Sequence, residues 1–184
     1  MLQGIEGDVS RSERTARFEE TFLPCLDAAY NLARWLTRNA HDAEDLVQEA
    51  YLRAFEHYDS FRGQSARAWL LTIVRNTCYS HLRRAIPTGE ADEFDEHVHS
   101  PQRSSEDPES FALKEADSRQ LAAALEGLPE EYREAIVLRE LEELSYKEVS
   151  AIAGVPIGTV MSRLARGRER LRQCLTAPAA KESR

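Results

Sequence analysis

The sequence predicts an all-α protein made of two small helical domains joined by a flexible acidic linker. Apolar residues recur every three or four positions over most of the chain, and no segment competes with the alternation of a strand. Acidic residues instead gather in one stretch rich in Pro and Ser, residues 87–117. This stretch holds ten acids and two bases, so its net charge of −8 equals that of the whole 184-residue chain. The remainder is close to neutral and can carry basic faces.

Composition excludes several classes of protein. No apolar run approaches the roughly 18 residues that span a bilayer, and the first residues lack the apolar core of a signal peptide. We therefore expect a cytoplasmic protein without membrane insertion. The three cysteines form no C-x-x-C pair, and His97 with His99 supplies too few ligands for a metal site. We find no nucleophile–base pair and no phosphate-cradling loop, so neither an enzyme nor a cofactor is predicted.

The N-terminal domain is predicted to span residues 15–86, after a flexible tail at residues 1–14 that lacks periodicity. Between Thr15 and Arg38 the apolar spacing predicts an amphipathic helix with a bend at Pro24. A second helix follows, with Asp42 as its expected N-cap and a continuous apolar stripe from Ala43 to Phe55. Its opposite face is polar and mostly acidic, which by itself is typical of a solvated helix surface.

A connector, residues 61–66, leads into the third helix of this domain. From Arg62 to Ile86 the chain has no acid and five arginines. The apolar residues of this helix predict a buried side, and the outer side is expected to present the following residues: Arg67, Arg75, Asn76, Tyr79, Arg83 and Arg84. Cations, an aromatic ring and a small polar connector suit the binding of unstacked single-stranded bases. An ordinary basic helix face is the alternative.

The C-terminal domain is predicted at residues 118–175, before a short tail at 176–184. One helix ends at Leu128-Pro129 and a second runs from Glu130 to Leu141. Two more helices follow. Ser145 and Glu148 form a capping box that begins the first, and Gly154-Val155-Pro156 joins it to the second.

The last helix buries apolar residues on one side and carries five arginines against one acid on its other faces. A helix-turn-helix with a basic second helix suits the major groove of DNA, where N-terminal residues reach base edges and later arginines meet phosphates. A solvated basic helix that closes a small bundle is the alternative.

Three motifs together resemble a known family. They are DAEDLVQEAYLRAF, FRGQSARAWLLTIVRNTCYSHLRR and LPEEYREAIVLRELEELSYKEVSAIAGVPIGTVMSRLARGRERL. In this order they closely resemble the extracytoplasmic-function (ECF) sigma factors, the smallest members of the bacterial sigma-70 family. The resemblance implies a region 2 helical bundle followed by a region 4 helix-turn-helix. It also implies an alternative sigma factor that directs promoter recognition and melting, with RNA polymerase core, promoter DNA and an anti-sigma factor as partners.

The resemblance also implies roles for individual residues. Asp45, Gln48 and Glu49 would bind polymerase core. The minus-ten element would be bound by Phe61, Arg62, Gly63, Gln64, Ser65, Ala66, Arg75, Asn76, Arg83 and Arg84. The minus-thirty-five element would be bound by Thr159, Met161, Ser162, Arg163 and Arg166. Met161 departs from the Lys or Arg that relatives often carry at this position, which alters one base or phosphate contact.

Two other functions compete with this interpretation. A two-domain helix-turn-helix regulator with a ligand-sensing first domain would bind promoter DNA without polymerase. A sigma-like decoy would only sequester an anti-sigma factor, and it would need neither set of DNA-facing arginines.

Overall fold

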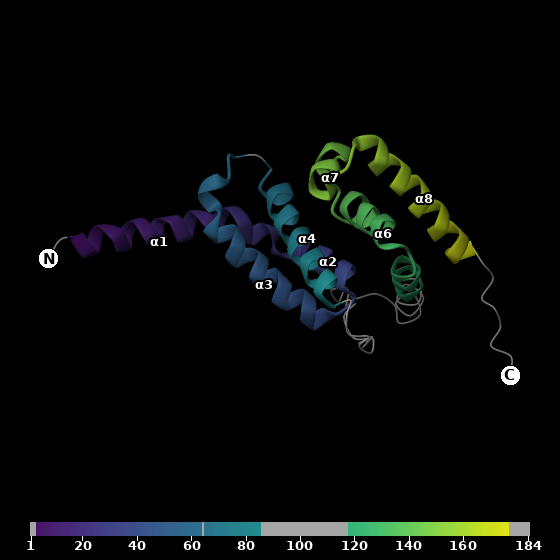
Figure 1. Ribbon diagram of the computed structural model, residues 1–184, viewed down its shortest axis with the longest axis horizontal. Helices are drawn as coiled ribbons and strands as arrows, with labels where there is room; N and C mark the ends of the chain where they lie inside the picture. The colour runs from purple at the N-terminus through teal and green to yellow at the C-terminus, as the bar shows by residue number, and fades with distance from the viewer. Residues whose placement is uncertain (1–2, 64, 86–117, 177–184) are drawn as a thin grey trace, which may run out of the picture.

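The computed structural model describes residues 3–63, 65–85 and 118–176 (Figure 1). Every regular element in these ranges is a helix, which confirms the predicted all-α fold. The predicted acidic linker, including His97 and His99, lies outside the described residues. Within the described ranges, no helix is both long and apolar enough to cross a membrane. The same ranges hold no cluster of three or more His, Cys, Asp or Glu side chains placed to bind a metal ion.

The described residues of the N-terminal half form four α-helices and two short 3₁₀ turns. In chain order they are α1 (Gln3–Phe22), η1 (Leu23–Cys25), α2 (Leu26–Thr37), α3 (Ala40–Glu56), η2 (Tyr58–Ser60) and α4 (Ala66–Ala85). The bend predicted at Pro24 is confirmed as η1, because proline supplies no backbone N–H and does not continue a helix.

Helix α1 begins at Gln3, inside the segment for which the sequence predicted a tail without periodic structure. Arg14 lies in this segment and donates a hydrogen bond to the Phe55 carbonyl oxygen at 2.8 Å. Its guanidinium also lies 4.6 Å from the centre of the Phe55 ring. These long-range contacts hold the segment near Arg14 against α3, and a search for local periodicity does not detect them.

The N-cap of α3 is Asn39, so the prediction of Asp42 as N-cap is wrong. The Asn39 side chain accepts hydrogen bonds from the backbone N–H groups of His41, at 2.8 Å, and Asp42, at 3.2 Å. Asp42 instead lies in the first turn, where its negative charge favours the helix dipole. The turn from α2 is short because Arg38 adopts a left-handed conformation, with φ of 60°.

Helices α2, α3 and α4 pack together around a core that includes Leu32, Leu46 and Val74. Aromatic rings close one end of this core. The fully buried Phe22 ring lies 5.2 Å from Trp69 and 5.3 Å from Phe61, measured between ring centres. The ring contact fixes the start of the connector between η2 and α4.

The C-terminal half begins with a helix over residues 118–126. It continues with α6 (Glu130–Ile136), the π-helical turn η3 (Val137–Leu141), α7 (Tyr146–Ala153) and α8 (Ile157–Thr176). Helix α8 crosses α6 closely at the buried Gly167. A Cβ at this position would lie 2.7 Å from Cδ1 of Ile136, so only glycine allows the two helices to approach this closely.

The predicted capping box of α7 is confirmed. The Ser145 hydroxyl oxygen accepts a hydrogen bond from the Glu148 N–H at 3.3 Å, and the Glu148 carboxylate accepts one from the Ser145 N–H at 2.9 Å. The backbone and side-chain hydrogen bonds from Ser145 lower the pKa of Glu148. Gly154 ends α7 with φ of 66°, the left-handed conformation predicted for it.

We expect Ser145→Ala to lower the free energy of unfolding by about 0.5–2 kcal/mol, because an N–H of the first turn of α7 loses its acceptor. Urea denaturation at neutral pH measures this loss.

The pH dependence of the stabilisation by the capping box follows from the lowered pKa of Glu148. The stabilisation is present above the ordinary pKa of 4.5, and it is lost as the pH falls through the lowered value of the folded state. Lys147→Ala, at an exposed site in the same helix, is the control and should change little. Equal effects of the two substitutions would contradict the prediction.

Candidate nucleic-acid interface

The two halves of the chain pack directly against each other. Helix α4 lies against α7 and α2 lies against α6, so α4 stands between α3 and the C-terminal half (Figure 1). Among the described residues, ion pairs of Arg75 with Glu134 and of Arg67 with Glu142 join the halves. Both carboxylates belong to the C-terminal half and are almost fully buried, with side-chain exposures of 1% and 3%. We call this packing the closed arrangement.

The Arg75–Glu134 pair is part of a small polar network. The Tyr79 hydroxyl donates to a Glu134 carboxylate oxygen at 3.3 Å, and the Arg75 guanidinium lies 4.4 Å from the centre of the Tyr79 ring. Burial alone would lower the pKa of Arg75, but its hydrogen bond to Glu134 and the carboxylate charge outweigh burial and raise it. Burial and the Glu134 charge raise the pKa of Tyr79. Arg75 is therefore charged and Tyr79 is neutral in the closed arrangement.

The sequence predicted that Arg67, Arg75 and Tyr79 are available on the outer side of α4. This prediction is wrong, because these side chains contact Glu142 and Glu134 of the C-terminal half. Sequence reasoning assigned α4 a single buried side. Leu70 and Leu71 are both fully buried, although neighbouring residues of a helix point about 100° apart. Two adjacent leucines in a basic helix were the signal that α4 is covered on more than one side.

The connector before α4 contains most of the residues assigned to the minus-ten element. Arg62 and Ser65 are exposed, and Gly63 is exposed with φ of 73°, a conformation that favours glycine. The Ser65 hydroxyl accepts a hydrogen bond from the Ala68 N–H at 3.3 Å, so Ser65 caps α4. Phe61 differs from these residues because its ring packs on Trp69, with ring centres 5.4 Å apart. It anchors the connector, and Gln64 lies outside the described residues.

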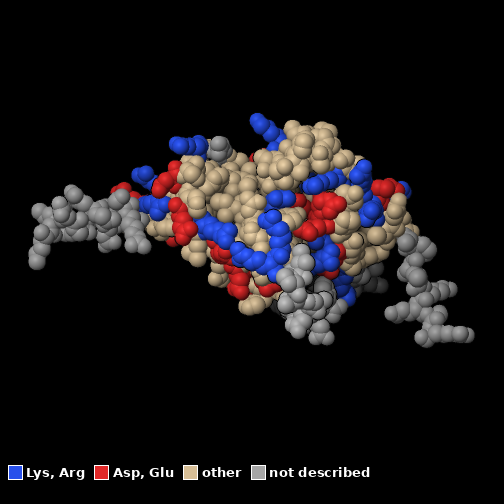
Figure 2. Space-filling view, viewed as in Figure 1, with Lys and Arg blue, Asp and Glu red and all other residues tan. Residues whose placement is uncertain are grey.

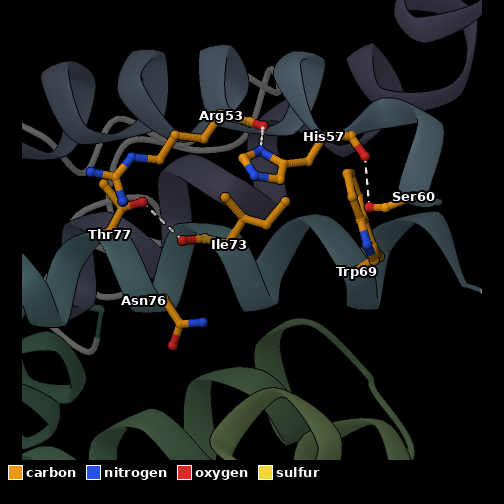
Figure 3. Close-up of a pocket in the computed structure, with 7 residues that line it drawn as sticks. All are labelled: Arg53, His57, Ser60, Trp69, Ile73, Asn76 and Thr77. Atoms are coloured by element: carbon orange, nitrogen blue, oxygen red, sulfur yellow. Dashed lines mark hydrogen bonds between the residues drawn. The ribbon is translucent and has the colours of Figure 1, made fainter.

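A depression of about 320 Å³ lies beside this connector, between α3 and α4. Its lining residues are Arg53, His57, Ser60, Trp69, Ile73, Asn76 and Thr77. The Arg53 side chain extends from α3 toward Thr77, the ring of His57, the C-cap of α3, lies over Ile73, and the Asn76 side chain points away from α3 (Figure 3). The sequence analysis assigned Asn76 to the minus-ten element but not Arg53, which lies on the polar face of α3, nor His57, because it sought this site on α4 and its connector alone.

Arg83 and Arg84 are exposed near the C-terminal end of α4. They lie roughly 27 Å along the helix from Ala66, which is half-buried at its first turn, given a rise of about 1.5 Å per residue. The residues assigned to the minus-ten element thus extend over the whole length of α4. The face of the molecule in Figure 2 shows basic and acidic side chains interspersed, without one continuous basic surface.

The polar face of α3 carries the residues assigned to polymerase. Asp45 and Gln48 are exposed, and Glu49 is half-buried and paired with Arg53. Leu52 lies on the same face, one turn after Gln48 and Glu49, and is 67% exposed. Helix α3 packs on α2 and α4 through its other side. Sequence reasoning missed Leu52, although it is a large apolar residue that falls outside the buried stripe.

The arginines of α8 are not equivalent. Arg168 donates to Glu140 at 3.2 Å, Arg172 pairs with Glu169, and the Arg170 guanidinium lies 5.3 Å from the centre of the Tyr132 ring. In the described part of the chain, Arg163 and Arg166 make no hydrogen bond or ion pair. These two were assigned to the minus-thirty-five element, together with the half-buried Thr159 and the exposed Met161 and Ser162. A helix-turn-helix with two free arginines and a separate basic helix defines a class of protein that binds nucleic acid through two modules.

Comparison with known families supports this class and narrows it. The family model described as Sigma-70 region 2 matches residues 22–86, and the one described as Sigma-70, region 4 matches residues 118–171. The ECF RNA polymerase sigma-E factor of Escherichia coli is 42% identical over 135 residues, which cover 70% of this chain and 71% of that protein. The ECF RNA polymerase sigma factor SigE of Mycolicibacterium smegmatis is 38% identical over 159 residues, 81% of this chain but only 58% of that protein. The chain therefore belongs to the ECF sigma factors of the sigma-70 family, as its motifs predicted.

Two solved structures are also similar. The sigma factor RpoE from Bartonella quintana, in complex with the anti-sigma factor NepR, matches with a TM-score of 0.72 and 32% identity. This match covers 88% of this chain and 98% of that one. CnrH, in complex with the cytosolic domain of CnrY, matches with a TM-score of 0.64. Its identity is 24% over 90% of this chain and 91% of that one, so this match shows the fold alone.

Proposed function

We propose that this chain is an alternative sigma factor that brings RNA polymerase core to the promoters of a stress- or signal-responsive regulon. The observation that carries the proposal is the presence of three distinct surfaces on one chain of this family. They are the polar face of α3 with Leu52, the connector and depression beside α4, and the free start of α8. Each surface has chemistry suited to one partner, namely polymerase core, separated DNA strands and duplex DNA respectively.

The proposed mechanism uses binding alone, without covalent chemistry or a cofactor. The start of α8 holds duplex DNA at the minus-thirty-five element, with Arg163 and Arg166 on phosphates or base edges. This positions the connector and Asn76 at the minus-ten element, where the DNA strands separate. Unstacking and extruding a base costs a few kcal/mol of free energy, which opposes melting. Contacts from Arg62 and Asn76 to the extruded base would offset part of that free energy. Polymerase fixes the spacing of the two modules through the polar face of α3, and fixed spacing raises their combined avidity.

We also propose that an anti-sigma factor binds this chain and favours the closed arrangement. The Bartonella relative was solved with such a partner, and its match to this chain includes residues of both halves in one superposition. In the closed arrangement, Glu134 forms an ion pair with Arg75, and Glu142 forms one with Arg67. Without these ion pairs, the two guanidinium groups would be available to DNA phosphates. A partner that stabilises this packing would therefore prevent promoter binding in the cytoplasm until a signal releases the chain.

Run-off transcription with purified polymerase core on a library of genomic fragments tests the proposed function. Core with the chain should start at discrete sites, whereas core alone should not. A regulator would instead protect promoter DNA without core, and a decoy would bind an anti-sigma factor but give no transcripts. The absence of discrete starts would contradict the proposal.

We expect the double substitution Asp45→Ala with Gln48→Ala to lower affinity for polymerase core about tenfold or more. It removes a charge and an amide from the polar face of α3, and each such contact contributes roughly 1 kcal/mol or more. Co-purification with tagged core at several salt concentrations measures the change. Glu131→Ala, which removes an exposed charge from α6 in the C-terminal half, is the control and should leave retention unchanged. Equal retention of the double variant and the wild type would refute the assignment of this face.

A further inference from the structure

One stripe of α4 carries residues that face the C-terminal half. Its members recur at intervals of four residues, so each lies beside the next on the helix surface: Arg67, Leu71, Arg75 and Tyr79. The stripe is about 18 Å long, at a rise of about 1.5 Å per residue. It combines cations with an aromatic ring, and the Arg75 guanidinium lies 4.4 Å from the centre of that ring. Such a combination suits the binding of unstacked single-stranded bases. We call these four residues the α4 stripe.

Carboxylates of the C-terminal half cover the polar members of the α4 stripe. Glu142 forms an ion pair with Arg67. Glu134 forms an ion pair with Arg75 and accepts a hydrogen bond from the Tyr79 hydroxyl at 3.3 Å. The first acid follows η3 and the second belongs to α6, so the fold of the C-terminal half brings both to α4. Because a carboxylate offers a guanidinium the same charged oxygen acceptors as a DNA phosphate, the two acids occupy positions that phosphates could take.

A third carboxylate reaches the connector at the start of α4. The hydrogen bonds from Ser145 make the largest contribution to the lowered pKa of Glu148, and a side-chain hydrogen bond from Ser65 and the charge of Arg67 lower this pKa further. Ser65 lies in the connector assigned to the minus-ten element, whereas Glu148 lies in the first turn of α7. The first helix of the helix-turn-helix thus packs on α4 and contacts the end of this connector.

The duplex-binding surface is not covered in this way. Helix α8 packs on α6 and α7, on the side of the C-terminal half that faces away from α4 (Figure 1). Arg166 is exposed and Arg163 is half-buried, and neither forms a hydrogen bond or ion pair with the residues that the structure describes. The closed arrangement therefore affects the two DNA-binding surfaces differently.

We propose that Glu134, Glu142 and Glu148 act as an internal substitute for phosphates. They keep α4 of the free chain from binding separated DNA strands, while the start of α8 stays available to duplex DNA. No partner is needed for this inhibition, because the acids belong to the chain itself. Single strands and closure oppose each other by linkage, so duplex contact can precede opening, whereas strand contact requires it. This inference rests on the proposed sigma-factor function for the roles of α4 and α8, and it adds an order of binding to that function.

DNA binding by the free full-length chain, without polymerase core, tests the inference. Fluorescence anisotropy is measured with labelled oligonucleotides of random sequence, either as single strands or as duplexes. We expect Glu134→Gln with Glu142→Gln to raise affinity for single strands about tenfold or more, because the substitutions remove the charges that compete for the guanidinium groups of α4. Affinity for duplex DNA should rise no more than in a control that loses the same charge elsewhere.

The matched control is Glu131→Gln with Glu143→Gln, which removes two exposed carboxylates from the same half of the chain. This control should bind single strands nearly as weakly as the wild type. Circular dichroism checks that the helices remain in both double variants. Equal gains in the two double variants would mean that net charge alone governs binding, and they would overturn the inference.

A second measurement uses a chain in which all three acids remain. Energy transfer between dyes on Cys174 and on a cysteine introduced as Glu56→Cys reports the separation of the two halves. Saturating single strands should lower the transfer, whereas duplex DNA should not. Single strands that bind without lowering the transfer would overturn the inference and leave the sigma-factor function intact. If even the variant with Glu134→Gln and Glu142→Gln had separated halves but bound no single strands, both the inference and the proposed role of α4 would be overturned.

Discussion

Replacing Glu134 by glutamine should separate the two halves of the chain. Glu134 is 1% exposed and neutralises Arg75, which is itself 19% exposed. Breaking a buried ion pair by removing one partner typically lowers stability by about 3–5 kcal/mol, because the remaining charge stays desolvated. Here the remaining charge is relieved when the halves separate and Arg75 reaches water. We therefore expect the ratio of open to closed chains to rise by about a hundredfold or more.

Fluorescence energy transfer between the two halves measures this opening. One dye can be placed on Cys174, which is exposed in α8, and a second on a cysteine introduced as Glu56→Cys at the end of α3. The other two cysteines are buried, and burial raises the pKa of Cys25 and raises that of Cys78 to about 12, so both should resist labelling. Transfer should fall in Glu134→Gln. It should not fall in Glu131→Gln, the matched control at an exposed position of α6. Unchanged transfer in Glu134→Gln would contradict the proposed importance of the ion pair.

The raised pKa of Arg75 determines how its contribution to the closed arrangement changes with pH. Arg75 has a raised pKa in the closed arrangement, so its contribution to closure is fully present below the ordinary value for arginine. It is lost only as the pH rises through the raised value, far above neutral. Physiological changes of pH therefore do not open the halves through Arg75. We expect an anion such as a DNA phosphate to compete with Glu134 for this guanidinium.

The helices of each half could be predicted from the sequence because their signals are local. The capping box at Ser145 and Glu148, the left-handed Gly154 and the bend at Pro24 each depend on residues within one or two turns. The helical spacing of apolar residues likewise predicted the buried Val149 and Val160. Asn39 shows the limit of local reasoning. Asn and Asp cap helices almost equally well, and only the position at which the chain leaves α2 decides between Asn39 and Asp42.

The packing between the halves could not be predicted in the same way. Glu134 in α6 and Glu142 just after η3 occur in an acidic stretch that resembles any solvated surface, and each is more than 50 residues from its arginine partner. A buried carboxylate is recognised only when its partner is known, because an unpaired charge would not stay buried. The same limit applies to the assigned sites. The family motifs assigned roles to Asp45, Asn76 and Arg166. The depression lined by Arg53 and His57 lies between two helices, so no short stretch of sequence predicts it.

Removing the two free arginines of α8 should have the largest effect on promoter selection. We expect Arg163→Ala with Arg166→Ala to lower holoenzyme affinity for promoter DNA by roughly 30-fold or more, since each contact to a base or phosphate contributes about 1–3 kcal/mol. The slope of log affinity against log salt concentration should fall by about 1 for each phosphate contact that is lost.

The double substitution Arg168→Ala with Arg172→Ala is the control. It removes the same charge, but Glu140 and Glu169 already pair with these two side chains. Run-off transcription and filter binding at several salt concentrations compare the two pairs. Retention on polymerase core should be unchanged in both, since α8 lies outside the polar face of α3. If the paired arginines proved as important as the free ones, the charge of α8 as a whole would attract DNA, and the assignment to individual residues would be wrong.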